Sequence, residues 1–197
     1  EKSIVYIAYS IQQENKFYDI DLNIPMINIK GNIPKEFNKV TQEVFVKKAN
    51  EVRKNKNNAE KIIYSIDYVG YLNDNILSII IKSSLKQGNN PQRIIIQTYN
   101  YNIETKEKVS LNNIIEQKNI NVQELQNKIN DVLKSVKKEE TILINSGYPV
   151  YERNLESEIY KIENITNFFL NEEGKLYIEF AYGNQNFTSE FDIVKYE

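Results

Sequence analysis

Three consecutive segments rich in isoleucine constrain the fold of this chain more than any other feature. They cover residues 62–72, 76–85 and 93–104, and polar turns at 73–75 and 86–91 separate them. Segments of this composition are typical of β-strands, and such short connections join strands that run antiparallel. Two of the segments contain three isoleucines in a row, as expected for strands that are covered on both faces. The sequence therefore predicts an antiparallel meander packed between other elements.

The spacing of apolar residues changes from period two to helical period in two places. Residues 34–55 and 122–138 carry apolar side chains at helical spacing, and Pro34 suits the first turn of the earlier helix. Strand-like segments precede that helix, and a closing hairpin follows the later one. We therefore predict an α+β fold, with antiparallel sheets and one helix docked in each of two subdomains. The expected subdomains are residues 1–60, a smaller β-β-α unit, and residues 61–197, an α+β unit with the meander, a helix and the closing hairpin.

Composition excludes several classes of function. The chain contains neither cysteine nor histidine, which removes thiol catalysis, disulfides, thiolate zinc sites and the commonest metal ligand. Its 25 basic and 27 acidic residues give a net charge of −2, without the basic surplus that nucleic-acid binding requires. We find no apolar run of the roughly 20 residues that a membrane span requires. No nucleotide-binding or calcium-loop motif occurs, so we expect no cofactor and no metal.

Carboxylate pairs are the remaining route to catalysis, because a glycan hydrolase needs two of them at a suitable separation. Three pairs are close in sequence: Asp19 with Asp21, Glu156 with Glu158, and Glu172 with Glu173. Asp19 and Asp21 share the polar face of a predicted strand, and the last pair lies in a hairpin turn, where polar residues are common. The sequence therefore favours a binding module over an enzyme, with a carboxylate-based glycan hydrolase as an alternative.

Several stretches resemble one known family. The run LSIIIKSSLKQGNNPQRIIIQTYNYNIETKEKVSLNNII at residues 77–115 resembles its pattern of strand, glycine loop, strand and Leu-x-Asp-Leu-Phe. The hairpin NFFLNEEGKLYIEFAYGN at 167–184, followed by FTSEFDIV, looks like its closing element, and residues 18–54 resemble the smaller domain that precedes it. The family is the extracytoplasmic domain of RsiV-type anti-sigma factors. It also occurs as an accessory domain of some polysaccharide deacetylases.

The resemblance implies a sensor on the extracellular face of the membrane of a Gram-positive cell. Such a domain binds lysozyme, and binding exposes the protein to signal peptidase and then to an intramembrane protease, which releases a sigma factor. The sigma factor would be held by a cytoplasmic segment, and a membrane anchor would lie upstream of Glu1, both outside this sequence. The alternative that the resemblance leaves open is an accessory domain beside a cell-wall deacetylase.

Contacts with the partner are expected from loops at one end of the C-terminal sheet, because its strands are occupied by the core and by strand pairing. The family often has Gly-Ala-His in the loop at 87–91, where this chain differs. Tyr182 and Phe187 would anchor the interface, since aromatic residues commonly carry binding energy. The predicted contact residues are Gln87, Gly88, Asn89, Asn90, Pro91, Tyr148, Pro149, Tyr151, Tyr182, Asn184, Asn186 and Phe187.

Overall fold

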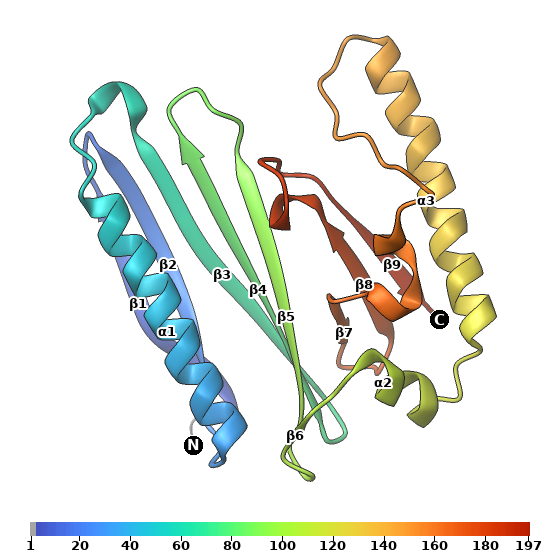
Figure 1. The fold of residues 1–197 in the computed structure, drawn as a ribbon. Coiled ribbons are helices and arrows are strands. Elements are labelled where there is room, and N and C mark those ends of the chain that lie inside the picture. The colour runs from blue at the N-terminus through green and yellow to red at the C-terminus, as the bar shows by residue number, and fades with distance from the viewer. Residues whose placement is uncertain (1–2) are drawn as a thin grey trace.

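The computed structural model describes residues 3–197 and contains a large and a small β-sheet, with helices on their outer faces (Figure 1). The predicted α+β fold class is confirmed. The strands are β1 (Val5–Glu14), β2 (Tyr18–Ile27), β3 (Ile62–Asn73), β4 (Ile76–Gln87), β5 (Arg93–Asn102), β6 (Glu107–Lys108), β7 (Phe168–Leu170), β8 (Leu176–Ala181) and β9 (Phe191–Tyr196). The helices are α1 (Asn32–Arg53), α2 (Leu111–Gln117) and α3 (Val122–Asn145), with short 3-10 turns η1 (Asn58–Glu60), η2 (Glu158–Tyr160), η3 (Ile162–Asn164) and η4 (Tyr182–Asn184).

The large sheet contains β1 to β6 in chain order, and the small sheet contains β7, β8 and β9. The meander β3-β4-β5 is antiparallel, as its short turns predict. One pair departs from the expectation of purely antiparallel sheets: β2 runs parallel to β3, from Tyr18 opposite Ile62 to Leu22 opposite Ile66. The reason is the connection between them, because α1 carries the chain back to the end of the sheet at which β2 began.

The predicted subdomain boundary between residues 60 and 61 crosses the large sheet. Strands β2 and β3 pair across it, and they share one hydrophobic core. Ile20 and Leu22 of β2 are buried in this core together with Tyr64 and Ile66 of β3. Residues on the two sides of the boundary are therefore joined by strand pairing and by common packing.

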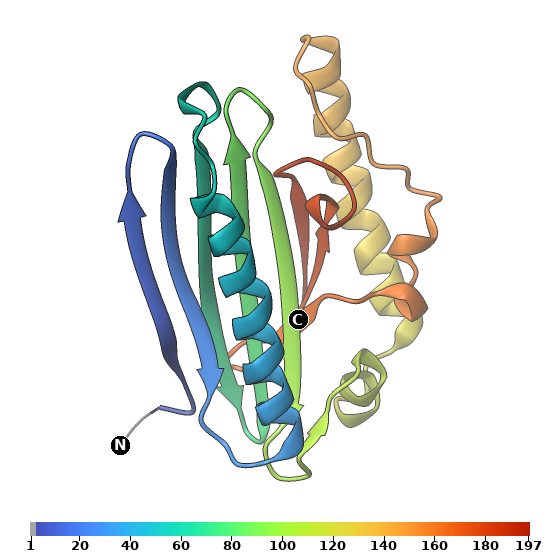
Figure 2. The same ribbon diagram turned by 60° about the vertical axis from the view of Figure 1, so that its left-hand side comes forward.

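Helix α1 covers one face of the large sheet (Figure 2). Its buried side contains Phe37, Thr41 and Phe45, at intervals of four residues. Val40 and Val44 belong to the predicted apolar stripe, but they are 44% and 55% exposed. Phe37 reaches Tyr99 of β5, with ring centroids 4.6 Å apart, but Val40 and Val44 line depressions between α1 and β5 and therefore stay partly open to solvent.

Helix α3 packs on the small sheet and forms a second core through Leu125, Ile129 and Leu133, again at intervals of four residues. It continues to Asn145, past the predicted end at residue 138. In this last part the helix extends beyond the core, and residues 142–144 (Ile-Leu-Ile) are exposed. Three apolar residues in a row do not follow helical spacing, so the sequence pattern did not predict that α3 continues through them.

The two sheets lie against each other across β4. Leu77 and Ile79 of β4 point toward α1, whereas Ser78 lies on the opposite face, since neighbouring residues of a strand alternate. The hydroxyl of Ser78 donates to Asn100 Oδ1 at 2.6 Å and accepts from the backbone N–H of Leu170 in β7 at 3.1 Å. The central strands are therefore covered on both faces, as their isoleucine runs predict.

Candidate functional site

Three predicted contact loops meet at the end of the molecule that carries the β4–β5 turn, uppermost in Figure 1. They line a hollow of about 440 Å³, formed by residues 91–92, 149–151 and 186–190, which we call the loop hollow. The loops come from distant parts of the sequence, so only the fold brings them together. The predicted residues that line the loop hollow are Pro91, Pro149, Tyr151, Asn186 and Phe187.

The rest of the β4–β5 turn lies outside the loop hollow. Gln87 ends β4, and Gly88 adopts a left-handed conformation with φ +54°. The backbone N–H of Gly88 donates to the carbonyl of Lys61 at 3.0 Å, so this part of the turn packs beside η1. Asn89 and Asn90 are exposed. Of the five predicted residues in this turn, only Pro91 reaches the loop hollow.

Tyr182 is buried, which corrects the expectation that it anchors a partner. Its side chain is 3% exposed, its ring stacks on Tyr151 with centroids 4.4 Å apart, and its hydroxyl donates to Asp192. The Tyr160 hydroxyl shares a second hydrogen bond with it at 2.8 Å. Burial, followed by the hydrogen bond with Asp192, raises the pKa of Tyr182. The sequence contained a signal, since Tyr182 continues the alternation of Ile178 and Phe180 on the buried face of β8.

Asn184 also has an internal role. Its Oδ1 accepts from the backbone N–H of Ile96 at 3.1 Å, and its Nδ2 donates to the carbonyl of Ile96 at 3.0 Å. A Cβ on the neighbouring Gly183 would lie 1.8 Å from the carbonyl oxygen of Ile94, so only glycine fits there. Turn η4 is therefore docked directly on β5. This docking positions Asn186 and Phe187 at the loop hollow.

A buried ion-pair cluster around Arg153 holds the segment after α3. Arg153 is 6% exposed, and it donates to Asp192 Oδ2 at 3.0 Å and to Glu190 Oε1 at 2.7 Å. The other oxygen of Glu190 accepts from the backbone N–H of Tyr151 at 2.6 Å. Burial opposes the charge on Arg153, but its hydrogen bonds to Asp192 and Glu190 outweigh burial and raise its pKa. The cluster fixes Tyr151 at the rim of the loop hollow, and sequence reasoning did not find it.

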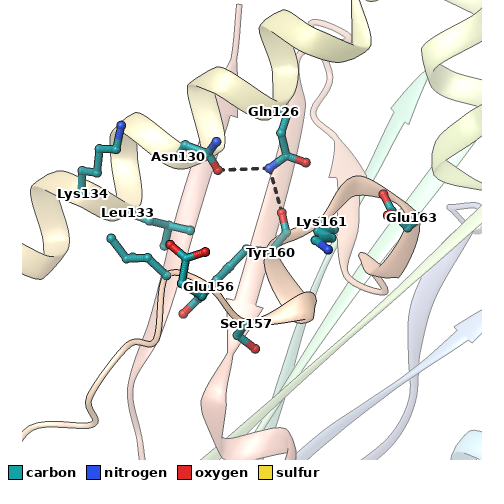
Figure 3. Close-up of a pocket in the computed structure, with 10 residues that line it drawn as sticks. Gln126, Asn130, Leu133, Lys134, Glu156, Ser157, Tyr160, Lys161 and Glu163 are labelled. Atoms are coloured by element: carbon teal, nitrogen blue, oxygen red, sulfur yellow. Dashed lines mark hydrogen bonds between the residues drawn. The ribbon is translucent and has the colours of Figure 1, made fainter.

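A second depression runs along α3 (Figure 3). It has a volume of about 480 Å³ and lies between one face of α3 and the segment that contains η2 and η3. We call it the helix cleft. Gln126, Asn130 and Lys134 of α3 lie on one side, at intervals of four residues, and Glu156 lies on the other. Sequence analysis singled out only Glu156 of this set.

The three candidate carboxylate pairs lie on different parts of the surface. Glu158 pairs with Lys161 at 2.6 Å, and Glu173 pairs with Lys175 at 3.1 Å, both in exposed positions. Three other carboxylates are buried, Glu140, Glu179 and Asp192. Glu179 of β8 is 7% exposed, and its Oε2 accepts no hydrogen bond from residues 3–197. Burial raises the pKa of Glu179 to about 7, and the charge of Lys82 opposes this shift. Its position between Ile178 and Phe180 predicts a solvent-facing side chain, so its burial could not be predicted from the sequence pattern.

Within residues 3–197, acidic side chains form no group of three or more that is close enough to hold a metal ion. The described helices are all too short or too polar to cross a membrane.

Comparison with known proteins gives matches at the level of structure. No family model matches the sequence, and no curated protein does. The fold is similar to the crystal structure of a DUF3298 family protein from Pseudomonas aeruginosa, with 11% identity, a TM-score of 0.54, and coverage of 97% of this chain and 86% of that one. A DUF3298 family member from Bacteroides fragilis matches at 10% identity and a TM-score of 0.48, over 90% and 81% of the two chains. DUF3298 is the domain family of RsiV-type proteins. The chain therefore has the fold of a DUF3298 family protein.

Proposed function

We propose that this chain is the extracytoplasmic sensor domain of an anti-sigma factor and that it binds lysozyme through the loop hollow. Binding triggers proteolysis near the membrane and releases a sigma factor held by a cytoplasmic segment. The domain itself performs no chemistry. This proposal combines the sequence resemblance to RsiV-type proteins with the DUF3298 fold.

The observation that carries the proposal is the convergence of three loops on one hollow. Residues 91–92, 149–151 and 186–190 line it together, although they are distant in sequence. Loops held by a rigid scaffold are the usual place for recognition. Here the scaffold is fixed at two points. Asn184 docks η4 on β5, and Arg153 binds Asp192 of β9, which holds the neighbouring loop at residues 149–151 in place.

Exposed aromatic side chains at and beside the loop hollow supply contact area. Phe187 is 46% exposed, and Tyr148, next to Pro149, is 62% exposed. The guanidinium of Arg93 lies 6.0 Å from the centroid of the Phe187 ring, which supports the ring from the β5 side. Large aromatic residues that become buried on binding commonly dominate interface energy. The net charge of −2 also favours a basic partner such as a secreted lysozyme.

Titration calorimetry with hen and human lysozyme tests the proposal. We expect saturable binding, and we expect Phe187→Ala and Tyr148→Ala each to weaken it by about 2 kcal/mol, roughly 30-fold. Tyr9→Ala is the matched control, because Tyr9 is 47% exposed but lies on β1, at the opposite edge of the large sheet from β5. It should bind as the parent does, and all variants should keep the parent's circular dichroism spectrum.

Two outcomes count against the proposal in different ways. No heat and no co-elution with lysozyme at roughly 50 μM, where an affinity in the micromolar range would be seen, would reject lysozyme as the partner. Binding that is equally strong in Phe187→Ala, Tyr148→Ala and Tyr9→Ala would reject the loop hollow as the site while leaving lysozyme as the partner.

A further inference from the structure

The helix cleft has a geometry that the lysozyme proposal does not use. Its two walls are held in place by one side chain, because the Gln126 amide donates to the carbonyl of Tyr160 at 3.0 Å. The Oε1 atom of Gln126 accepts from the backbone N–H of Ile162 at 3.2 Å. Figure 3 shows Gln126 spanning from α3 to the η2–η3 segment. These two hydrogen bonds fix the spacing of the two walls.

Polar groups on both walls are left free to bind a ligand. Asn130 uses its Oδ1 to accept from Gln126 at 3.2 Å, which leaves its Nδ2 as a donor. Lys134, one turn further along α3, adds an ammonium group, and Glu156 on the opposite wall adds a carboxylate. None of these three groups, the Asn130 amide nitrogen, the Lys134 ammonium and the Glu156 carboxylate, has a hydrogen-bond partner in residues 3–197. The α3 wall thus presents free donors, and Glu156 presents a free acceptor on the opposite wall, where Lys161 pairs with Glu158 at 2.6 Å.

Charges in the cleft cancel. Two lysines, 134 and 161, and two glutamates, 156 and 163, line it, so the lining residues have no net charge. Lys161 also pairs with Glu158, just outside the lining, at 2.6 Å. An anionic ligand such as a phosphate would require a surplus of cations, and a cationic ligand a surplus of carboxylates. The lining therefore selects for a ligand that is polar but uncharged.

Apolar side chains form part of the same surface. Leu155 is the partly exposed apolar side chain in the lining, whereas Leu133 and Tyr160, at 2% and 3% exposed, form the buried floor beneath it. A volume of about 480 Å³ lies within the usual range of ligand sites, and the stretch from Gln126 to Lys134 is about 12 Å long. The cleft accordingly has room for an elongated ligand with polar edges and an apolar face.

We propose that the helix cleft binds a short neutral oligosaccharide. A sugar hydroxyl both donates and accepts hydrogen bonds, so it suits free donors on α3 that face the carboxylate of Glu156. The C–H face of a pyranose ring is apolar and matches Leu155. In this arrangement Asn130 and Lys134 donate to ring hydroxyls, and Glu156 accepts from them. This site is separate from the loop hollow and does not depend on lysozyme binding.

Titration with neutral trisaccharides tests this inference, with chemical shifts of the backbone amides as the readout. Chitotriose, maltotriose and cellotriose are suitable probes, because they differ in linkage and in N-acetylation but carry no charge. We expect at least one of them to produce saturable shifts centred on residues 126–134 and 155–163. Asn130→Ala and Glu156→Gln should each weaken this binding at least tenfold.

Asn127→Ala is the matched control. Asn127 lies on α3 and accepts from Gln123 at 3.0 Å, as Asn130 accepts from Gln126, but it is outside the helix cleft. It should bind the sugar as the parent does, and so should Phe187→Ala, which tests the loop hollow instead. The inference is overturned if no neutral trisaccharide binds at about 10 mM, a concentration that detects even millimolar affinity. It is also overturned if Asn130→Ala and Asn127→Ala bind alike, or if the cationic trimer of glucosamine or anionic trigalacturonate binds more tightly than the neutral sugars.

Discussion

The side chain of Asn184 pairs with the backbone of Ile96 as a neighbouring strand would. Its Oδ1 accepts from the Ile96 N–H at 3.1 Å, and its Nδ2 donates to the Ile96 carbonyl at 3.0 Å. One amide thus satisfies both polar groups of a residue on β5, whose ladder partner on the other side is β4. This contact joins the closing part of the chain to the large sheet and places the loop that carries Phe187.

Replacing Asn184 should therefore lower stability. Asn184→Ala removes both hydrogen bonds, and we expect the free energy of unfolding to fall by about 2 kcal/mol, because the Ile96 N–H loses its partner. The Ile96 carbonyl keeps a second partner, since it also accepts from Asn167 Nδ2 at 3.1 Å. Asn186→Ala is the control, since Asn186 is exposed and its side chain makes no hydrogen bond to residues 3–197. Urea denaturation of both variants measures the difference. Equal stability of the two would show that the Asn184 contact contributes nothing.

Gly183 should tolerate no side chain. A Cβ there would lie 1.8 Å from the Ile94 oxygen and 2.7 Å from the Thr188 oxygen, both of which are backbone atoms. We expect Gly183→Ala to cost about 3 kcal/mol or more, because η4 must move off β5 to admit the methyl group. Gly70→Ala is the comparison, since its Cβ would meet Val5 at an ordinary 3.5 Å. Thermal unfolding should separate them clearly, and similar melting temperatures would contradict the close approach of η4 to β5.

The Arg153 cluster should contribute far more to the free energy of unfolding than an exposed ion pair does. Arg153→Met leaves Asp192, which is 8% exposed, as a buried carboxylate without its cation, and we expect a loss of about 3–5 kcal/mol. Lys161→Met removes a pair with Glu158 in which both side chains are at least half exposed, 50% and 69%, so its effect should stay below about 1 kcal/mol. Chemical denaturation of the two variants provides the test. If Arg153→Met costs no more than Lys161→Met, the cluster does not hold the loop.

Glu179 should make stability depend on pH. Burial raises the pKa of Glu179 from 4.5 to about 7 in the folded protein, so between these values the folded state binds a proton that the unfolded state has lost. The contribution of Glu179 to the free energy of unfolding is therefore greatest below pH 4.5. It falls as pH rises toward 7, and it changes little above that. Over this whole pH range, the contribution of Glu179 to the free energy of unfolding falls by at most about 3 kcal/mol.

The measurement is the free energy of unfolding at pH 5 and pH 8, for the parent and for Glu179→Gln. The informative quantity is the difference between the two proteins, because it isolates the effect of Glu179. The free energy of unfolding of Glu179→Gln should increase relative to that of the parent as pH rises, because glutamine does not ionise. Parallel pH profiles would mean that Glu179 is not buried as the structure places it.

Local patterns in the sequence determined the elements of the fold. The isoleucine runs predicted β3, β4 and β5, and the polar turn at residues 73–75 forms with Asp74 in the left-handed region, at φ 48°. Helical spacing predicted α1 and most of α3. These features depend on side chains within a few residues of one another, so the sequence displays them directly. The same patterns favoured a set of contact loops, five residues of which line the loop hollow.

Only the tertiary structure decided which segments meet. The parallel pairing of β2 with β3, the burial of Tyr182, the carboxylate of Glu179 and the cluster around Arg153 all join residues that are distant in sequence or on opposite sides of a strand. Asn184 illustrates the reason. Its amide could bind a partner or a strand equally well by its chemistry, and it binds Ile96 because the fold brings β5 within hydrogen-bonding distance. The role of such a side chain is set by its neighbours in space, which local periodicity does not encode.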